Sequence, residues 1–162
     1  MAVMGTVLGH GWWLTMLALA GSTPASAQLA NEVLTVSTTV PAQCRVQADD
    51  LDLGFYTSSS PSRATSTINL QCSPGVVASI ALSGGQSGDP TNRTMRAGGD
   101  LHYQLYQDEA RTRLFADRNP SEFKVVQATG LSQRILVYGE APAGQQAPEG
   151  LYVDVVVVTV TY

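Results

Sequence analysis

The stretch that most strongly indicates the fold is Gly150-Leu151-Tyr152-Val153-Asp154-Val155-Val156-Val157-Val158-Thr159-Val160-Thr161-Tyr162, at the end of the printed sequence. After its first glycine, the stretch contains no further glycine and no proline, and its only charged residue is Asp154. β-Branched and aromatic residues of this density are typical of a long β-strand. No later segment of the printed sequence could pair with the second edge of this strand. An apolar strand edge is an aggregation hazard, so we expect another strand to cover it.

The two faces of this predicted strand differ in polarity, because alternate side chains of a strand point to opposite sides. The more apolar set is assigned to the core: Val156, Val158, Val160 and Tyr162. The other set would face away from it: Val153, Val155, Val157, Thr159 and Thr161.

The N-terminal 27 residues are typical of a secretory signal peptide. Residues 11–20 are rich in Trp, Leu and Met, and Ala25-Ser26-Ala27 offers a small-residue cleavage site. The alternative, a transmembrane anchor, needs about 20 apolar residues, and Gly21-Ser22-Thr23-Pro24 interrupts the run. We therefore expect export and one mature domain over residues 28–162, which is an ordinary domain length.

Charge and cysteine content narrow the function classes. The formal net charge of -4 argues against a nucleic-acid partner, because such proteins present a basic patch. The cations are scattered, and we expect them to be solvated surface charges. An oxidising compartment would allow a disulfide between Cys44 and Cys72. The alternative is a catalytic or metal-binding thiol, but His102 is the only histidine after residue 27.

Period-two patterns with frequent turn signals predict an all-β sandwich. Leu34–Val40 alternates apolar and hydroxyl residues and predicts a half-buried strand before Pro41. Shorter strand-like pieces follow at Cys44–Val46 and Leu51–Tyr56. Further strands are expected to bury these alternating sets: Ala64, Ser66, Ile68, Leu70 and Cys72; Val76, Ala78, Ile80 and Leu82; Leu101, Tyr103 and Leu105.

Catalytic and ligand-binding patterns are weak. His102 alternates with Leu101 and Tyr103, which places it on the surface rather than beside a nucleophile. Asp49-Asp50 and Asp52 lack the ligand spacing of a calcium loop and are expected to form a solvated turn. Gly84-Gly85 has no predicted helix after it to bind phosphate, so we expect a flexible connection. We predict no enzymatic activity, no cofactor, no metal site and no small-molecule substrate.

Eight features occur in an order that resembles the spore coat protein U domain family, which is similar to subunits of archaic chaperone-usher pili. They are Cys44, Leu51-Asp52-Leu53-Gly54-Phe55-Tyr56, Ile68-Asn69-Leu70-Gln71-Cys72, Ala81-Leu82-Ser83-Gly84-Gly85, Arg93-Thr94-Met95, Leu101-His102-Tyr103-Gln104-Leu105-Tyr106, Val137-Tyr138-Gly139 and Gly150-Leu151-Tyr152-Val153-Asp154. Each feature alone is weak evidence. Their order and spacing together carry the resemblance, which covers essentially residues 28–162.

The resemblance implies an immunoglobulin-like β-sandwich that lacks its last strand and is completed by a donor strand. A periplasmic chaperone would supply that strand first, and the N-terminal extension of another subunit would replace it. Residues 28–38 stand where the extension is expected, with Leu34 and Val36 as its apolar donor residues. Val156, Val158, Val160 and Tyr162 would then face the chaperone or donor strand.

The function implied is that of an exported structural subunit that polymerises into a surface pilus for adhesion or biofilm formation. Its partners would be a periplasmic chaperone, an outer-membrane usher and copies of itself or related subunits. The alternative is a secreted spore or cell coat component, or an adhesin module, that does not polymerise.

Overall fold

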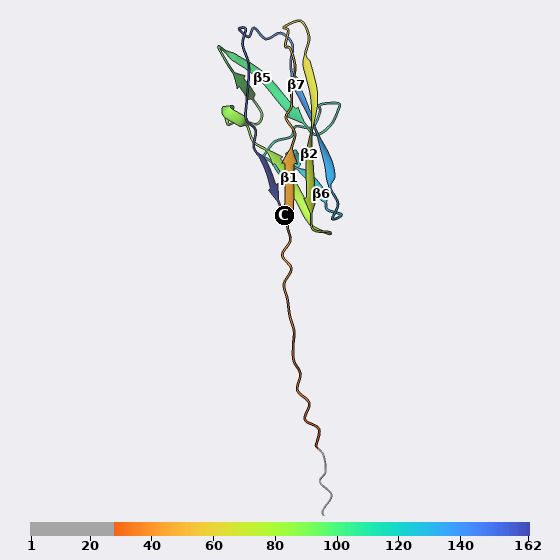
Figure 1. Ribbon diagram of the computed structural model, residues 1–162. Helices are drawn as coiled ribbons and strands as arrows, with labels where there is room; N and C mark the ends of the chain where they lie inside the picture. The colour runs from red at the N-terminus through yellow and green to blue at the C-terminus, as the bar shows by residue number, and fades with distance from the viewer. Residues whose placement is uncertain (1–27) are drawn as a thin grey trace, which may run out of the picture. The chain divides into compact units, whose positions relative to one another are not determined.

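The computed structural model describes residues 28–162, and the expected signal peptide lies outside the described residues. The described part contains strands and two short 3-10 helices, η1 and η2 (Figure 1). None of its helices is long and apolar enough to cross a membrane. The element bounds are β1 (Cys44–Ala48), β2 (Ser62–Cys72), β3 (Val77–Leu82), η1 (Gly85–Ser87), β4 (Arg93–Arg96), β5 (Asp100–Tyr106), η2 (Pro120–Glu122), β6 (Lys124–Gln127), β7 (Gln133–Ala141) and β8 (Val158–Thr161).

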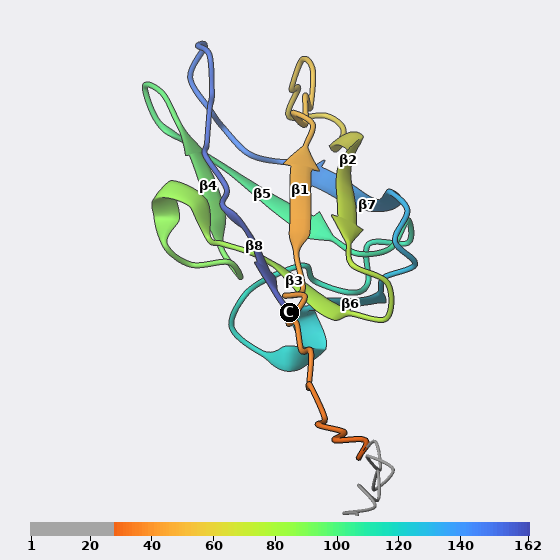
Figure 2. The same cartoon turned by 60° about the horizontal axis from the view of Figure 1, so that its bottom comes forward.

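The strands form two antiparallel sheets, as the all-β prediction requires. The larger sheet has the order β1-β2-β7-β5-β4, and the smaller has the order β6-β3-β8. The edge strands β1 and β8 belong to different sheets and lie next to each other (Figure 2). The boundary between these two strands is therefore one open side of the structure.

The core lies between the sheets and consists of the predicted alternating side chains. Ile68 and Leu70 of β2 are buried, as are Ile80 and Leu82 of β3, and Phe115 completes the packing from a loop. Fully burying an aliphatic side chain of this size stabilises a fold by about 1.5–3 kcal/mol. The predicted inward sets of these strands are confirmed.

The C-terminal strand is shorter than predicted. Only Val158–Thr161 forms β8, which pairs with β3, and Val153 makes a single bridge to Arg96. The predicted alternation nevertheless extends through the stretch, with even-numbered residues from Tyr152 to Val160 half-buried and odd-numbered residues exposed. Tyr162 departs from the predicted core set, because 58% of its surface is exposed. It follows the last paired residue of β8, so no neighbouring strand covers it.

Two further predicted strands are absent from the described chain. Residues 28–43 form no strand, and Leu34 and Val36 are 87% and 85% exposed, so the half-buried strand predicted over Leu34–Val40 is wrong for this domain. Alternating residues bury one face only where a neighbouring strand or sheet lies beside them. The stretch Leu51–Tyr56 is a loop, although Leu51 packs against the core.

Candidate functional site: a groove between two strand edges

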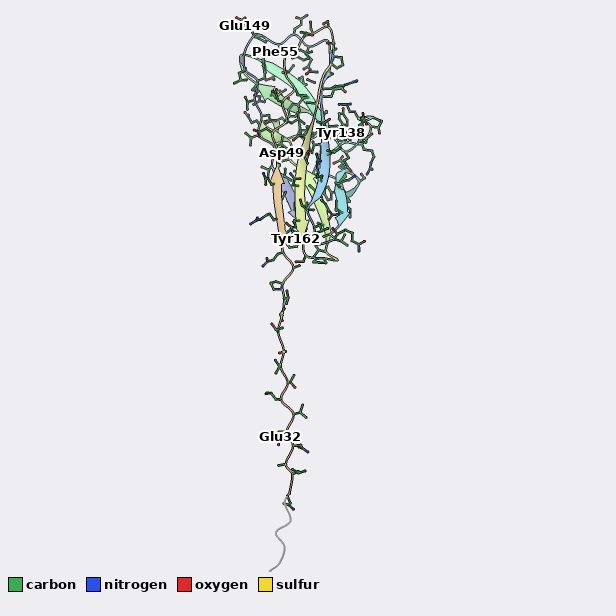
Figure 3. The ribbon with its side chains drawn as sticks, turned by 45° about the vertical axis from the view of Figure 1, so that its right-hand side comes forward. Glu32, Asp49, Phe55, Tyr138, Glu149 and Tyr162 are labelled. Carbon is green, nitrogen blue, oxygen red and sulfur yellow. A yellow bond between two sulfur atoms is a disulfide. The ribbon has the colours of Figure 1, made fainter. Side chains whose placement is uncertain are left out.

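A groove lies between the end of β1, with the loop after it, and the C-terminal segment Tyr152–Val158. Its volume is about 580 Å³. Figure 3 shows Asp49, which lines the groove, just beyond the end of β1, and Tyr162 near the beginning of β1. The groove therefore follows the open side of the sandwich.

The backbone of β8 is unpaired on the side that faces the groove. The amide of Ser83 donates to the Val157 carbonyl at 3.0 Å, and the amide of Val157 donates to Ser83 Oγ at 2.8 Å. In an antiparallel ladder, the backbone groups of alternate residues face the same neighbour. Those of Val158 and Val160 consequently point away from β3, and no other strand of the described chain pairs with that side of β8.

The backbone of β1 is unpaired in the same way. The Ser73 amide donates to the Gln43 carbonyl and the Asp49 amide donates to the Thr67 carbonyl, both at 2.9 Å. The odd-numbered residues of this stretch thus face β2, and the backbone groups of the even-numbered residues face outward. The groove therefore begins between two strand edges, at Ala48 of β1 and Val158 of β8, whose outward amides and carbonyls have no strand partner, and this is the arrangement that accepts an added β-strand.

A disulfide joins Cys44 and Cys72, which lie opposite each other at one end of the β1–β2 pair. The bond links the edge strand β1 covalently to β2, so it fixes one border of the groove. The predicted bridge is therefore present, and no free cysteine is found in the part of the chain that the structure describes. The disulfide argues against the alternative of a catalytic or metal-binding thiol at these two residues.

The floor of the groove is apolar and one end is acidic. Core residues of both sheets line it, with the half-buried Val156 and Val158 along one side. Asp49, Asp50 and Asp52 line the acidic part of the groove and are exposed, as predicted, but the segment is an extended loop and not the predicted turn. An apolar strand would thus bury its side chains along most of the length of the groove.

Asp154 fixes the start of the C-terminal segment. Its Oδ1 accepts hydrogen bonds from the amides of Gln86 and Val155, each at 2.7 Å, and its Oδ2 accepts one from the Tyr103 hydroxyl at 2.6 Å. Gly85 has a φ of +63° and leaves no room for a side chain, since a Cβ there would lie 2.1 Å from Asp154 Oδ2. The prediction of a flexible Gly84-Gly85 connection is therefore wrong, because the carboxylate holds this loop as η1.

The Tyr103 hydroxyl remains protonated at every physiological pH. Burial raises the pKa of Tyr103 far above its ordinary value, and the hydrogen bond to the Asp154 carboxylate raises it further. The phenol is thus a permanent donor between β5 and the C-terminal segment. This contact contributes to the position of one wall of the groove.

Arg93 is fully buried, which the sequence did not indicate. Its Nε donates to the Ser83 carbonyl, and its Nη2 donates to the carbonyls of Leu82 and Phe115, each at 2.9 Å. A further bond joins Nη1 to the Pro90 carbonyl at 3.1 Å. Burial lowers the pKa of the guanidinium. The prediction that the cations are all solvated is wrong for Arg93, which joins β4, the end of β3 and the loop at Phe115.

The other predicted site residues are not brought together. Leu34 and Val36 lie in the exposed segment 28–38, which by itself forms no strand, and their donor role stays a prediction. His102 is exposed, as predicted, and its Nδ1 lies 3.2 Å from Thr94 Oγ1. Within residues 28–162, no group of three or more His, Cys, Asp or Glu side chains is arranged to hold a metal ion.

Comparison with solved structures supports the fold. A chain in the crystal structure of the CsuC-CsuE chaperone-tip adhesion subunit pre-assembly complex, from archaic chaperone-usher Csu pili of Acinetobacter baumannii, matches with a TM-score of 0.57 and 23% identity. The match covers 76% of the present chain and 41% of the length of that chain. No curated protein matches the sequence.

The family model described as Spore Coat Protein U domain matches residues 30–159. The matched region extends from the exposed N-terminal segment to β8, so it includes both borders of the groove. The chain belongs to the Spore Coat Protein U domain family.

Proposed function

We propose that this protein is an exported subunit of a surface pilus, assembled through a chaperone and an usher, whose incomplete immunoglobulin-like sandwich is completed by a strand from another subunit. The observation that carries the proposal is the groove with two unpaired strand borders. Each backbone hydrogen bond formed there would stabilise the complex by about 0.5–1.5 kcal/mol. The apolar floor would add the burial of alternate side chains of the incoming strand.

The donor would be residues 28–38 of a second copy or of a related subunit. This segment alternates apolar and polar residues, is exposed and forms no strand in its own domain. Leu34 and Val36 would each contribute about 1.5–3 kcal/mol if fully buried in a neighbour. Asn31 and Glu32 weaken the front half of the segment as an apolar donor, so its second half would supply most of the affinity.

Head-to-tail strand donation produces an open filament, because each copy donates at one end and accepts in its groove. Before assembly, a periplasmic chaperone would fill the groove and protect the free strand edges. The solved structure that shares the fold comes from a chaperone–subunit complex, which supports a chaperone partner. The disulfide supports a location outside the cytoplasm, where such bonds persist.

Deleting residues 28–36 tests the donor role. The truncated subunit would be expressed with and without its cognate chaperone and sized by gel filtration. We expect a soluble, chaperone-bound monomer that does not polymerise, because the truncated chain keeps its groove but has no donor strand. Long polymers of the truncated protein would contradict the proposal, and loss of all soluble protein would indicate that the segment belongs to its own fold.

A matched pair of substitutions avoids truncation. Replacing Val36 by Asp would place a charge among the apolar donor side chains, whereas replacing Thr35 by Asp would place the same charge on the other face of the segment. We expect the first change alone to stop polymerisation. Equal effects of the two substitutions would contradict the assigned donor face.

The alternative function is a secreted coat component or adhesin module that does not polymerise, which the description of the family as a spore coat domain favours. The mass of native, unheated protein from the cell surface distinguishes the two functions. A ladder of multiples of the subunit mass supports the pilus, and a single monomer band supports the coat module. Family membership favours a structural, non-catalytic role under both readings.

A further inference from the structure

The outer surface of the smaller sheet carries no charged side chain. We call this surface, together with the outward side of the segment that leads into β8, the valine face and define it by six residues: Val77, Val125, Val155, Val157, Thr159 and Thr161. The four valines are 58–68% exposed, and the two threonines are also exposed. The remaining outward positions of β3 and β6 are uncharged as well. An exposed sheet face without a single charge is unusual in a soluble domain, where charged residues normally keep the surface free of apolar patches.

The outer surface of the larger sheet has the opposite character. Arg63 pairs with Glu140 at 2.8 Å across β2 and β7, and Arg111 lies 3.4 Å from the same carboxylate. Arg134 also stands on an outward position of β7. The lack of charge is therefore a property of one face of the sandwich.

The valine face and the groove use opposite sides of one segment. Val157, Thr159 and Thr161 are exposed and do not line the groove, whereas Val156 and Val158 do, and Val155 is exposed at the rim of the groove. A strand that fills the groove consequently leaves the valine face uncovered except at Val155. Completion of the fold cannot explain why this face is apolar.

We propose that the valine face is a lateral contact between two fibres of this chain, an inference that rests on the proposed polymerisation. Two copies of the same face can meet about a two-fold axis, as in other isologous contacts between sheets. The chain has a net charge of -4, so most of its surface would repel a second copy. The valine face brings no like charges into direct contact, and a charged partner would find no complementary group on it.

The valine face is large enough to hold two fibres together by repeated contacts, but too small to pair two free subunits. A stable protein–protein interface takes about 20–30 residues from each partner, and the three-stranded sheet offers far fewer outward positions. A single contact is therefore too weak to pair two monomers. Along a fibre the same contact repeats, and linked weak contacts can raise the overall affinity by about 10²–10⁴-fold.

The test uses full-length fibres that carry Val77→Lys and Val125→Lys together, with Thr65→Lys as the control. Thr65 is exposed on the outer surface of the larger sheet, so the control adds charge elsewhere on the domain. Electron microscopy would measure the length of single fibres and the fraction of fibres that run side by side. We expect wild-type and Thr65→Lys fibres to associate laterally and the double variant to lose at least 90% of the lateral pairs at unchanged fibre length.

The outcomes separate this inference from the proposed function. Lateral pairs that persist in the double variant, or that vanish equally in Thr65→Lys, overturn the lateral contact while fibre formation stands. Absence of fibres from the wild-type protein overturns both. If the double variant is not exported, a second double variant with Val77→Thr and Val125→Thr replaces it, because threonine keeps a β-branched side chain. This variant should reduce the fraction of laterally paired fibres at least threefold. An unchanged fraction of paired fibres overturns the inference. Wild-type pairing should also survive 0.5 M salt, and loss of pairing there would show that charges hold the fibres together.

Discussion

Replacing Val158 by Asp probes the C-terminal strand and has a built-in control at the next residue. Val158 lies opposite Leu82 in the β3–β8 pair, is half-buried and packs against the core. Thr159 is its neighbour, is exposed and points to the other side of the sheet. The same carboxylate therefore enters the core side in one variant and the solvent in the other.

The expected loss of stability in Val158→Asp follows from the burial of the Val158 side chain. Full burial of a valine stabilises a fold by about 1.5–3 kcal/mol, so the half-buried Val158 contributes about 1 kcal/mol. An aspartate there must either ionise without a partner or bind a proton, and each unit by which its pKa rises costs about 1.4 kcal/mol at neutral pH. With a pKa rise of about two units for this half-buried position, the two effects together predict a loss of about 3–4 kcal/mol. Domains of this size have only about 5–15 kcal/mol in total.

The assay is denaturant unfolding of the purified variants, with the amount of protein at the cell surface as a second measurement. We expect Val158→Asp to lower the midpoint sharply and to abolish surface protein, and Thr159→Asp to stay within about 0.5 kcal/mol of the wild type. Equal stability and equal surface yield of the two variants would refute the assignment of even-numbered residues to the core side.

Three further predictions concern the supports of the groove. Gly85→Ala should destabilise the protein by about 2–3 kcal/mol, because a Cβ would displace Asp154. Gly88 has a φ of +71° and open space around it, so the control Gly88→Ala should cost only about 1 kcal/mol for its backbone. Equal losses of stability in chemical denaturation would argue against the Asp154 contact. The pKa of Tyr103 is higher in the folded protein than in the unfolded chain, so the free energy of unfolding keeps its full contribution from this group below pH about 10. Above that pH the free energy of unfolding should fall by up to about 1.4 kcal/mol per pH unit. Tyr103→Phe should reduce this slope in pH-dependent unfolding. Replacing both cysteines by serine removes a loop closure with a sequence separation of 28 and should cost about 3–4 kcal/mol, measured as a lower unfolding midpoint that reduction of the wild type reproduces.

Most of the fold could be predicted because alternation is a local signal. The buried sets on β2 and β3 follow the period of two in the sequence, and the structure reproduces them. The same local signal cannot tell whether a strand finds a neighbour. Leu34–Val40 alternates as clearly as β2 does, yet it lies exposed and outside any sheet.

The contacts that shape the groove could not be predicted because they join distant parts of the sequence. Nothing near Arg93 indicates that carbonyls from β3 and from Phe115 will surround its guanidinium. The contact between Asp154 and the loop at Gly85 likewise joins residues 69 positions apart. One usable signal was present: a lone acid in an otherwise apolar strand needs hydrogen-bond donors once it is partly buried, although its partners are not named by the sequence.

The short β8 is a physical consequence of its single neighbour. From Tyr152 to Val157 the side chains already alternate between the core side and the solvent. The backbone there makes one isolated bridge, the contacts to Ser83, and hydrogen bonds to the side chains of Gln86 and Asp154. In the proposed assembly, an incoming strand would not have to reverse any side chain of this segment. It would only have to add hydrogen bonds to a row of groups that already face it, so little of the binding free energy is lost to reorganisation. The same free row explains why the subunit would need a chaperone until that strand arrives.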